Sequence, residues 1–428
     1  MTSFPIRIIV LGLAWAIVGG CMAAPGGVYE EGDFSDLGKA DAYTRRSGRK
    51  TAQARRVPWS GYYWSMIRGE LVMGWEDGAG RQELTALGVD EFDNCIDSYE
   101  EECVALIDEL AVDDGRALSP LMKFDLYVRR RLEDEFGPGE APADHYSHAS
   151  RWELDHHYIG DDEEHPKWEA RGYAGKCIGW ALSTFDWDEP TTDQVIGGIL
   201  FRPADVKGIL AAIYNGAQFF IPEDLVMGTE YHTAHLGDED YDAEQAYADV
   251  EPHLFVQALY ATIGEGRMLE ADLDPGDGVW NYPIYRFELK WTRETRTSTV
   301  LEVEVKIFYA NDEVGIDEVF STDPERPDLL SRVLTFELHV PRSWDGDLTR
   351  ARRGRWTGES IDNHPDALLL GIEEGWRETI EEYRGDPNMG LEVNFDLILP
   401  FGGEGGWDPM VDDLLAEYYS ASARSEDP

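Results

Sequence analysis

One cysteine in this chain stands in a setting that suits a nucleophile. Cys177 follows a glycine-rich stretch, and after it comes an apolar run beginning at Trp180, which predicts that a loop ends and a helix begins at the cysteine. A thiolate in the first turn of a helix is stabilised by the helix dipole and by free N–H groups. The same N–H groups can bind the oxyanion of a tetrahedral intermediate. We therefore predict a covalent reaction at Cys177, with a buried structural cysteine as the alternative.

A thiol nucleophile needs a base and a group that orients the base. Residues 253–263 are rich in β-forming types, a glycine turn follows, and residues 268–272 are read as a short second strand. A helix is the alternative for the first segment. We predict that the strands place His253, as the base, beside Asp272, which would fix the imidazole tautomer. Asn281 is an alternative orienting residue, and a purely structural role is the alternative for His253.

The N-terminus predicts export. Residues 8–18 form an unbroken apolar run, which is too short to span a bilayer but fits the core of a signal peptide. The run is followed by Gly-Gly-Cys21, which resembles a bacterial lipobox, so we predict a lipoprotein signal peptide over residues 1–20 and lipidation of Cys21. An ordinary secretory signal is the alternative. Met22 after the cysteine indicates an outer-membrane or cell-surface location, and the membrane contact would be the lipid anchor alone.

The other cysteines, the composition and the net charge limit the disulfide pairing, the class of chain and the partners that the sequence allows. Export allows a disulfide between Cys95 and Cys103, which would leave Cys177 unpaired. Apolar residues make up 43% of the 428 residues, which is enough for a core, and this excludes a chain that is disordered throughout. The formal net charge of −48 excludes nucleic acid as a partner. The sequence leaves the oligomeric state open.

Two segments have some features of metal sites. Residues 238–242 carry acids at alternate positions, as an EF-hand loop does, but the loop lacks its glycine and its final glutamate. Calcium is therefore possible there, with a solvated acidic loop as the default. Five histidines between residues 145 and 165 are spaced too irregularly to predict zinc. No metal ligands are assigned.

Several short motifs occur in this chain in the same order as in one known protein family. The segment from Val279 to Tyr285, Val-Trp-Asn-Tyr-Pro-Ile-Tyr, is similar to the Val-Trp-Asn-Gln-Pro-Val segment of the oomycete transglutaminase elicitor family. Cys-Ile-Gly-Trp-Ala at Cys177 resembles its Cys-His-Gly-Trp-Ala, with Ile178 in place of histidine. Val256 stands where the family pattern has another histidine. Further matches lie at residues 58–64, 150–158, 201–210, 356 and 363–366.

The resemblance implies a protein-glutamine γ-glutamyltransferase, an acyltransferase whose substrates are protein glutamine side chains and primary amines. Cys177 would form a thioester, His253 would serve as the base and Asp272 would orient it. Trp180, Trp280 and Asn281 would bind substrate, with core packing as the alternative for Trp180. A cysteine peptidase or amidase that uses water as acceptor, and a non-catalytic envelope-binding lipoprotein, are the alternative functions.

The predicted fold class is α+β, with a papain/transglutaminase-like cysteine-nucleophile core and a β-rich C-terminal extension. We predict a flexible tether over residues 21–56, a catalytic core over residues 57–284 and the extension over residues 285–428, packed on the core. Within the extension, residues 285–290, 299–309, 333–340 and 391–399 have strand patterns and residues 372–384 a helix pattern. The final ten residues are expected to fray.

Overall fold

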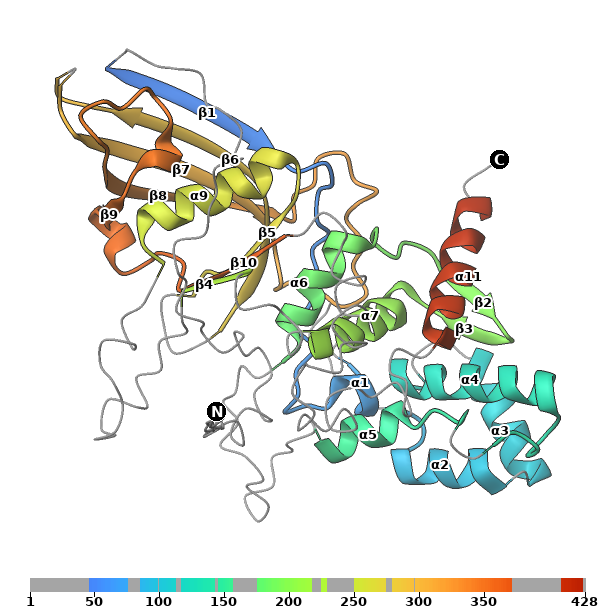
Figure 1. The fold of residues 1–428 in the computed structure, drawn as a ribbon. Coiled ribbons are helices and arrows are strands. Elements are labelled where there is room, and N and C mark those ends of the chain that lie inside the picture. Colours follow the sequence, from blue (N-terminus) through green and yellow to red (C-terminus); the bar gives the residue numbers. More distant parts are fainter. Residues whose placement is uncertain are drawn as a thin grey trace, which may run out of the picture.

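The fold contains a group of helices and a curled antiparallel sheet, each with its own hydrophobic core (Figure 1). The structure is a computed structural model, and it describes residues 46–75, 85–98, 100–112, 117–142, 145–156, 175–217, 225–228, 250–274, 279–295, 297–371 and 409–425. We call the two sets of buried apolar side chains the helical core and the sheet core. The α+β class predicted from the sequence is confirmed.

The helical core surrounds two adjacent helices, α6 (Cys177–Asp186) and α7 (Pro203–Ala217). They pack closely because Gly179 has no side chain: a Cβ there would lie 2.7 Å from the backbone nitrogen of Asn215 and closer still to the carbonyl of Ala211. Around them lie α1 (Glu70–Met73), α2 (Val89–Ser98), α3 (Glu101–Val112), α4 (Pro120–Phe136), α5 (Ala149–His156), α11 (Pro409–Ser425) and the hairpin of β2 (Gln194–Ile196) and β3 (Ile199–Phe201).

The described residues form an eight-stranded antiparallel sheet with the order β4-β10-β5-β6-β7-β8-β9, and β1 pairs with the second half of β6. The strands are β1 (Ser47–Gln53), β4 (Val226–Gly228), β5 (Leu269–Asp272), β6 (Asn281–Thr292), β7 (Val300–Ala310), β8 (Leu329–His339), β9 (Arg353–Trp356) and β10 (Ala367–Leu370). Helix α9 (Pro252–Ala261) covers one face of this sheet, and three short 3₁₀ helices, η5 (Ile263–Glu265), η6 (Leu348–Arg350) and η7 (Gly358–Ile361), lie beside it.

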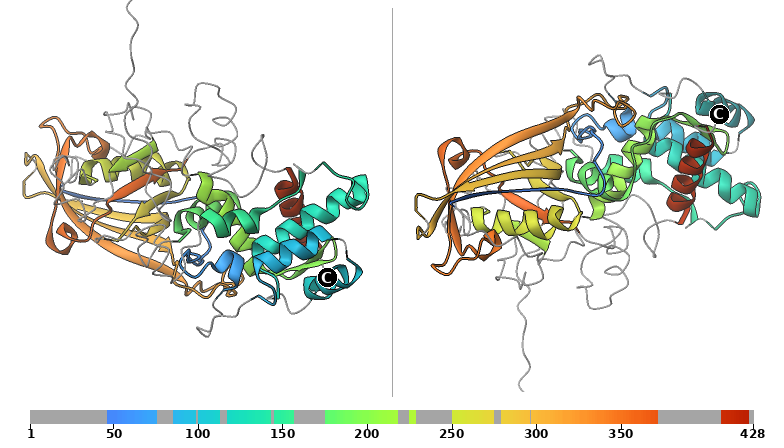
Figure 2. Two further views of the ribbon diagram at one scale, coloured as in Figure 1. Left: turned by 90° about the horizontal axis from the view of Figure 1, so that it is seen from below. Right: turned by 90° about the horizontal axis from the view of Figure 1, so that it is seen from above.

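Side chains of β5 alternate between the two faces of the sheet, and this alternation determines where the site lies. Leu269 and Ala271 belong to the sheet core that α9 covers. Glu270 and Asp272 therefore point to the opposite face. In the register of the sheet, Glu270 lies beside Leu369 of β10, which belongs to the helical core. Leu369 thus links the acid-bearing face to the helices, which lie at one end of the sheet (Figure 2).

Several sequence-based boundaries differ from the structure. The predicted tether contains β1, which pairs along its whole length with β6. The predicted boundary between residues 284 and 285 falls inside β6. Residues 409–425 form α11, whose Leu414, Leu415 and Tyr418 are fully buried in the helical core, so this segment is not part of a β-rich extension. Fraying was predicted for the final ten residues, but those up to 425 are helical, and residues 426–428 lie outside the described residues.

Other predicted elements agree with the structure or lie outside it. The strand patterns at 285–290, 299–309 and 333–340 correspond to β6, β7 and β8. Residues 1–20, 238–242, 372–384 and 391–399 lie outside the described residues. Within the part of the chain that is described, no helix has the length and apolar character needed to cross a bilayer.

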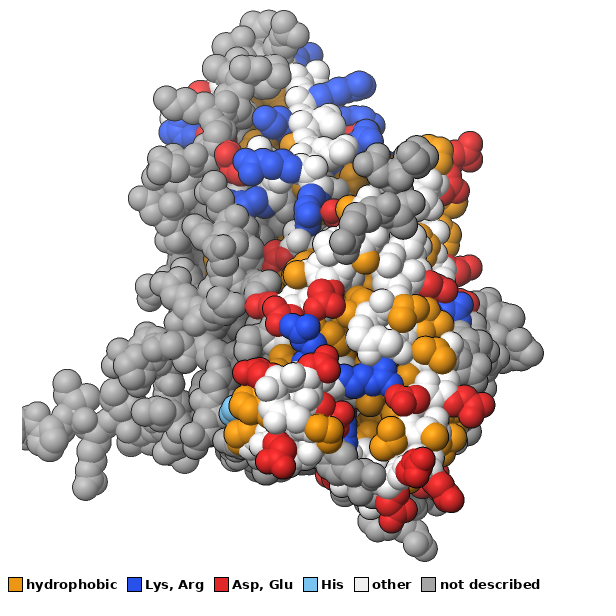
Figure 3. Space-filling view, turned by 90° about the vertical axis from the view of Figure 1, so that its right-hand side faces the viewer, with side chains coloured by type: hydrophobic (Ala, Val, Ile, Leu, Met, Phe, Trp, Pro, Cys, Tyr) orange, Lys and Arg blue, Asp and Glu red, His pale blue; other side chains and the backbone are white. Residues whose placement is uncertain are grey.

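Charge is distributed unevenly on the face shown in Figure 3. Acidic side chains gather over the lower, helical part of this view, and Lys and Arg side chains are more frequent over the upper, sheet part. Ion pairs offset part of this charge in both regions, for example Arg131 with Asp413 on the helices and Lys290 with Glu304 on the sheet. On this face the acidic excess of the chain therefore lies mainly over the helices.

The contact at Gly179 gives a direct test of the packing between α6 and α7. We expect Gly179→Ala to lower the free energy of unfolding by about 1–3 kcal/mol, because backbone atoms of α7 must shift to admit the methyl group. Chemical denaturation measures the change. Gly88→Ala is the control, because a Cβ there meets nothing within 4 Å. Equal stabilities of the two variants would contradict the close packing.

Candidate functional site

The sulfur of Cys177 lies where α6 meets β6. Cys177 is the first residue of α6, as predicted, and it is fully buried. The side-chain amide of Asn281 donates a hydrogen bond to Sγ at 3.4 Å, and the carbonyl oxygen of Val279 lies 3.7 Å from the same atom. The first N–H groups of a helix have no partner within it and form the positive end of its dipole. The arrangement can therefore hold a thiolate and an adjacent oxyanion.

Cys177 does not carry a free thiol in this structure. Cys95 and Cys103 are bonded to each other, which confirms the pairing that their spacing allowed. No described cysteine is free, and Cys177 is itself disulfide-bonded. The expectation that Cys177 is unpaired is therefore wrong for this state. Since the thiolate is the nucleophile, the sulfur must be reduced before it can react.

Asp272 and Asn281 are direct neighbours across the β5–β6 pair. The Oδ1 of Asp272 accepts hydrogen bonds from the backbone N–H groups of Asp274 (3.1 Å) and Trp280 (3.0 Å). Its Oδ2 is buried and has no hydrogen-bond partner among the described residues. Burial, with smaller contributions from Asp366 and Glu270, raises the pKa of Asp272 well above its usual value. The structure thus brings Cys177, Asn281 and Asp272 together.

His253 lies apart from this group. Residues 252–261 form α9 rather than the predicted strand, and apolar side chains of α9 pack on the sheet core. Helix α9 covers the sheet face opposite to the one that carries Asp272. The Nδ1 of His253 lies 3.0 Å from the carboxylate of Glu251. The predicted placement of His253 beside Asp272 is therefore wrong. A proline at position 252, which suits the first turn of a helix, was the sequence signal for α9.

The two tryptophans predicted to bind substrate have different surroundings. Trp280 is half-buried, and its ring meets the ring of Tyr63 with centroids 5.3 Å apart. Trp180 is fully buried in the helical core and packs edge-on against Trp59 at 6.4 Å. Trp280 is therefore partly open to solvent, whereas the surroundings of Trp180 correspond to the alternative, core packing.

Glu270 is a buried acid that the sequence analysis did not single out. It is 3% exposed, and its Oε1 has no hydrogen-bond partner among the described residues. Burial raises its pKa to about 8. Glu270 lies two residues before Asp272 on the same face of β5, so the site has a second carboxyl group that is largely protonated at neutral pH. The apolar residues around it predict the strand, but no local pattern marks Glu270 itself.

The residue before Cys177 anchors the start of α6. Lys176 is 1% exposed, and its Nζ lies 3.0 Å from a carboxylate oxygen of Glu153 on α5. Burial lowers the pKa of Lys176, while Glu153 acts in the opposite direction. The backbone N–H of Lys176 also donates to the carbonyl oxygen of Tyr63. Both contacts fix the position of the helix start, and hence of Cys177.

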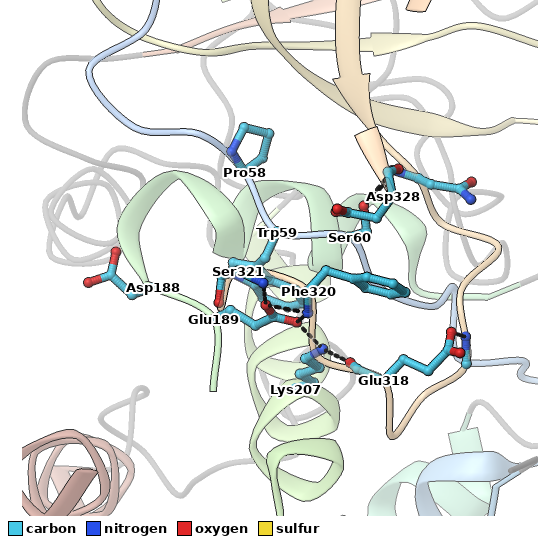
Figure 4. A network of polar contacts seen from close by, with 12 residues as sticks. Pro58, Trp59, Ser60, Asp188, Glu189, Lys207, Glu318, Phe320, Ser321 and Asp328 are labelled. Atoms are coloured by element: carbon cyan, nitrogen blue, oxygen red, sulfur yellow. Dashed lines mark hydrogen bonds and ion pairs between the residues drawn. The ribbon is translucent and has the colours of Figure 1, made fainter. Parts of the chain in front are cut away.

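A polar network holds the loop after β7 against the helices (Figure 4). The buried Nζ of Lys207 donates to the carboxylate of Glu189 at 2.6 Å and to the carbonyl oxygen of Glu318 at 2.7 Å. The same carboxylate accepts from the backbone N–H groups of Phe320 (3.1 Å) and Ser321 (2.7 Å). Moving the loop away would separate these partners and leave a buried charge uncompensated, which costs free energy. The network therefore holds the loop in place.

The loop in turn holds residues 58–64, which reach the site. The side chain of Arg326 donates to the carbonyl oxygen of Pro58 at 2.8 Å. The backbone N–H of Gly61 donates to the carbonyl oxygen of Asn311 at 2.9 Å. At its far end this segment places Tyr63 against Cys177 and Val279. Contacts from both the sheet and the helices therefore determine the position of Tyr63.

The titration of Glu270 has a consequence for stability. A carboxyl whose pKa is higher in the folded than in the unfolded state binds more protons when the chain is folded. Its contribution to the free energy of unfolding is therefore complete below the unfolded pKa of about 4.5 and is lost as the pH rises to about 8. We expect Glu270→Gln to be more stable relative to the natural chain at about pH 8.5 than at about pH 5, by ~4 kcal/mol. Thermal or chemical denaturation at both pH values measures this. A pH-independent difference would contradict the burial of an ionisable Glu270.

Comparison with known proteins gives one family match and one structural likeness. Among solved structures, the crystal structure of the GP42 transglutaminase from Phytophthora sojae is similar, with a TM-score of 0.43, 14% sequence identity, and coverage of 75% of this chain and 83% of that chain. No curated protein matches the chain. Residues 166–315, which include Cys177, Asp272 and Asn281, match the family described as transglutaminase elicitor. The stretch of the chain that carries the candidate site is therefore similar to the transglutaminase elicitor family.

Proposed function

We propose that the reduced protein transfers acyl groups from protein glutamine side chains to primary amines through a thioester on Cys177. The observation that carries this proposal is the contact between the sulfur of Cys177, at the start of α6, and the side-chain amide of Asn281. The match of residues 166–315 to the transglutaminase elicitor family supports the choice of glutamine as donor. A cysteine at the start of a helix that packs against an antiparallel sheet also supports the papain/transglutaminase-like core.

The proposed chemistry has two stages. The thiolate of Cys177 attacks the carboxamide carbon, and the negative charge moves to the carboxamide oxygen. The amide of Asn281 and the first N–H groups of α6 are donors that would stabilise this oxyanion. When the intermediate collapses, the C–N bond breaks and the nitrogen leaves with a proton as ammonia. A primary amine then attacks the thioester, loses its proton and releases the thiolate.

The role proposed for Asp272 is to orient the base. Its buried Oδ2, which has no hydrogen-bond partner among the described residues, is an acceptor for an imidazole N–H. Gly228 ends β4 and pairs with Ala367, the first residue of β10. Ala271 pairs with Leu368, so the next residue of β5, Asp272, lies at the same end of the sheet as Gly228. The next histidines after Gly228 in the sequence are His232 and His235, which lie outside the described residues. We propose one of these two as the base.

Lipidation would also affect the redox state of the nucleophile. We propose that the exported chain is anchored through a lipid on Cys21, which lies outside the described residues. The chain has four cysteines, and Cys95 and Cys103 are already paired. A thioether on Cys21 would leave Cys177 without a cysteine of its own chain to pair with. Lipoprotein maturation would therefore favour the free thiol that the reaction needs.

Incorporation of a fluorescent primary amine into a glutamine-rich protein tests the proposed activity. We expect incorporation by the reduced protein, and a loss of at least about a thousandfold in Cys177→Ala, because the covalent step is removed. We expect little activity without a reductant, since the disulfide-bonded sulfur cannot attack. The assay is run with and without calcium. Ammonia release without amine incorporation would instead indicate hydrolysis, and neither product from the folded, reduced protein would contradict the proposal.

Histidine variants test the placement of the base. We expect His253→Ala to lower kcat less than about tenfold, because α9 lies on the opposite face of the sheet, and Asp272→Ala to lower it more than about a hundredfold. One of His232→Ala and His235→Ala should match the loss in Asp272→Ala. A loss in His253→Ala as large as that in Cys177→Ala would contradict this placement and identify His253 as the base.

A further inference from the structure

The outer edge of strand β8 is only partly covered by its neighbour. Strand β9 pairs with β8 from Phe336 to His339, and no strand of the described residues pairs with this edge ahead of Phe336. The backbone N–H of Thr335 donates to the hydroxyl of Ser360 at 2.9 Å, and its carbonyl oxygen accepts from the N–H of Thr357 at 2.9 Å. Both backbone groups of Thr335 therefore point away from β7.

The backbone groups of Ser331 and Val333 point to the same edge. In an antiparallel pair, the N–H and C=O of one residue face the partner strand and those of the next residue face away. The register of β7 and β8 is continuous from Leu329 to His339, so Ser331 and Val333 present their backbone groups outward, as Thr335 does. Both residues are exposed. An added strand can therefore continue the sheet here, and we call this stretch the open edge of β8.

Apolar side chains flank the open edge on both faces of the sheet. Leu330 is 39% exposed and lies on the same face as Leu334, which belongs to the sheet core. Val333 is 51% exposed and lies on the opposite face. Ile361, which ends η7 beside β8, is 56% exposed. A strand added at this edge would therefore meet an apolar neighbour on each face.

Sheet edges of soluble proteins usually carry charges that discourage the addition of a strand. Strands β1 and β9 each pair with a single strand of the described residues, and they follow this rule: β1 exposes Arg49, and β9 exposes Arg353 and Arg355. The open edge of β8 exposes one serine and two apolar residues instead. It is therefore suited to binding a strand rather than protected against it.

The charges around the open edge indicate the chemistry of the partner. Between its two ends, the guanidinium of Arg332 donates to the carbonyl oxygen of Leu273. Lys306, the neighbour of Val333 on β7, has Glu288 of β6 directly opposite on its other side. Exposed acids lie at both ends, in the loop before β8 and around the end of η7: Asp323, Glu325, Glu359 and Asp362. These acids favour a segment with basic side chains at its ends.

A second copy of this chain is a poor occupant of the open edge. The register that pairs Ser331 of each copy with Val333 of the other uses both open residues, but it places Arg332 directly opposite its counterpart. Like charges in directly opposite positions destabilise a sheet. The formal net charge of −48 on each copy adds repulsion.

We propose that the open edge of β8 binds an extended peptide segment of another protein, which adds to the sheet as a further strand. The segment has apolar side chains that contact Leu330, Val333 and Ile361, and basic side chains at its ends. Main-chain hydrogen bonds to Ser331 and Val333 provide affinity, and the side-chain contacts provide specificity. This interaction does not depend on the proposed reaction at Cys177.

Selection of peptides displayed on phage tests the proposal. Random peptides of about ten residues, the length of a long strand, are selected on the immobilised full chain. We expect the enriched sequences to be rich in β-branched and aromatic residues, to lack internal proline and to carry Lys or Arg near their ends. The most enriched peptide is then synthesised with a fluorescent label, and fluorescence anisotropy measures its affinity.

Two variants of β8 test whether that peptide binds the open edge. Ser331→Pro removes an outward N–H and leaves the pairing with β7 in place, and Val333→Asn removes an apolar contact. We expect each change to weaken binding at least about tenfold. Val195→Asn changes a residue that is 64% exposed on β2, so it is the matched control and should leave the affinity within about twofold.

Three results would overturn the proposal. The first is no enrichment, or equal affinity of the peptide for the natural chain and for folded Ser331→Pro and Val333→Asn. The second is enrichment of peptides dominated by Asp and Glu. The third is a dimer of the natural chain, seen by sedimentation velocity, that Ser331→Pro dissociates, because it would assign the edge to a second copy. If Ser331→Pro does not fold, Val333→Asn and Ile361→Asn test the same contact.

Discussion

The contact between the first turn of α6 and the first residue of β6 is the interaction on which the site depends. It joins Cys177, whose helix is buried among other helices, to Asn281, whose strand belongs to the sheet. Because helices and sheet have separate hydrophobic cores, a small shift of one against the other would separate the sulfur from the amide. The site therefore requires that the helices and the sheet keep fixed positions relative to each other.

Several buried contacts outside the site maintain that relation. The pair of Lys207 and Glu189 holds the loop after β7 against α7. The pair of Lys176 and Glu153 holds the start of α6 against α5. Each ion pair is desolvated, so it adds little net stability, but it fixes the relative positions of the elements that it joins. The same reasoning explains why residues 58–64, which have no regular secondary structure, can present Tyr63 in a fixed position: both the helices and the sheet loop bind their backbone.

The local signals in the sequence predicted the elements of the site better than their arrangement. Glycines followed by an apolar run correctly predicted a helix start at Cys177, and the strand at Asp272 also formed. The segment after His253 has β-forming residues, yet it is a helix because its apolar side chains pack together on the sheet core. The burial of Glu270 depends on helices from a distant part of the chain, so no local pattern reveals it. Strand β1 has alternately exposed residues and few apolar ones, which resembles a linker until its pairing with β6 is seen.

The central claim is that Cys177 carries the acyl group, and a trapped thioester tests it most directly. The reduced protein is mixed with a glutamine-containing peptide, quenched rapidly in acid and measured by intact-mass and peptide mass spectrometry. The account predicts an adduct equal to the peptide minus ammonia, located on Cys177 and absent from Cys177→Ala. An adduct that persists in Cys177→Ala, or no adduct on the folded and reduced natural chain, would contradict it.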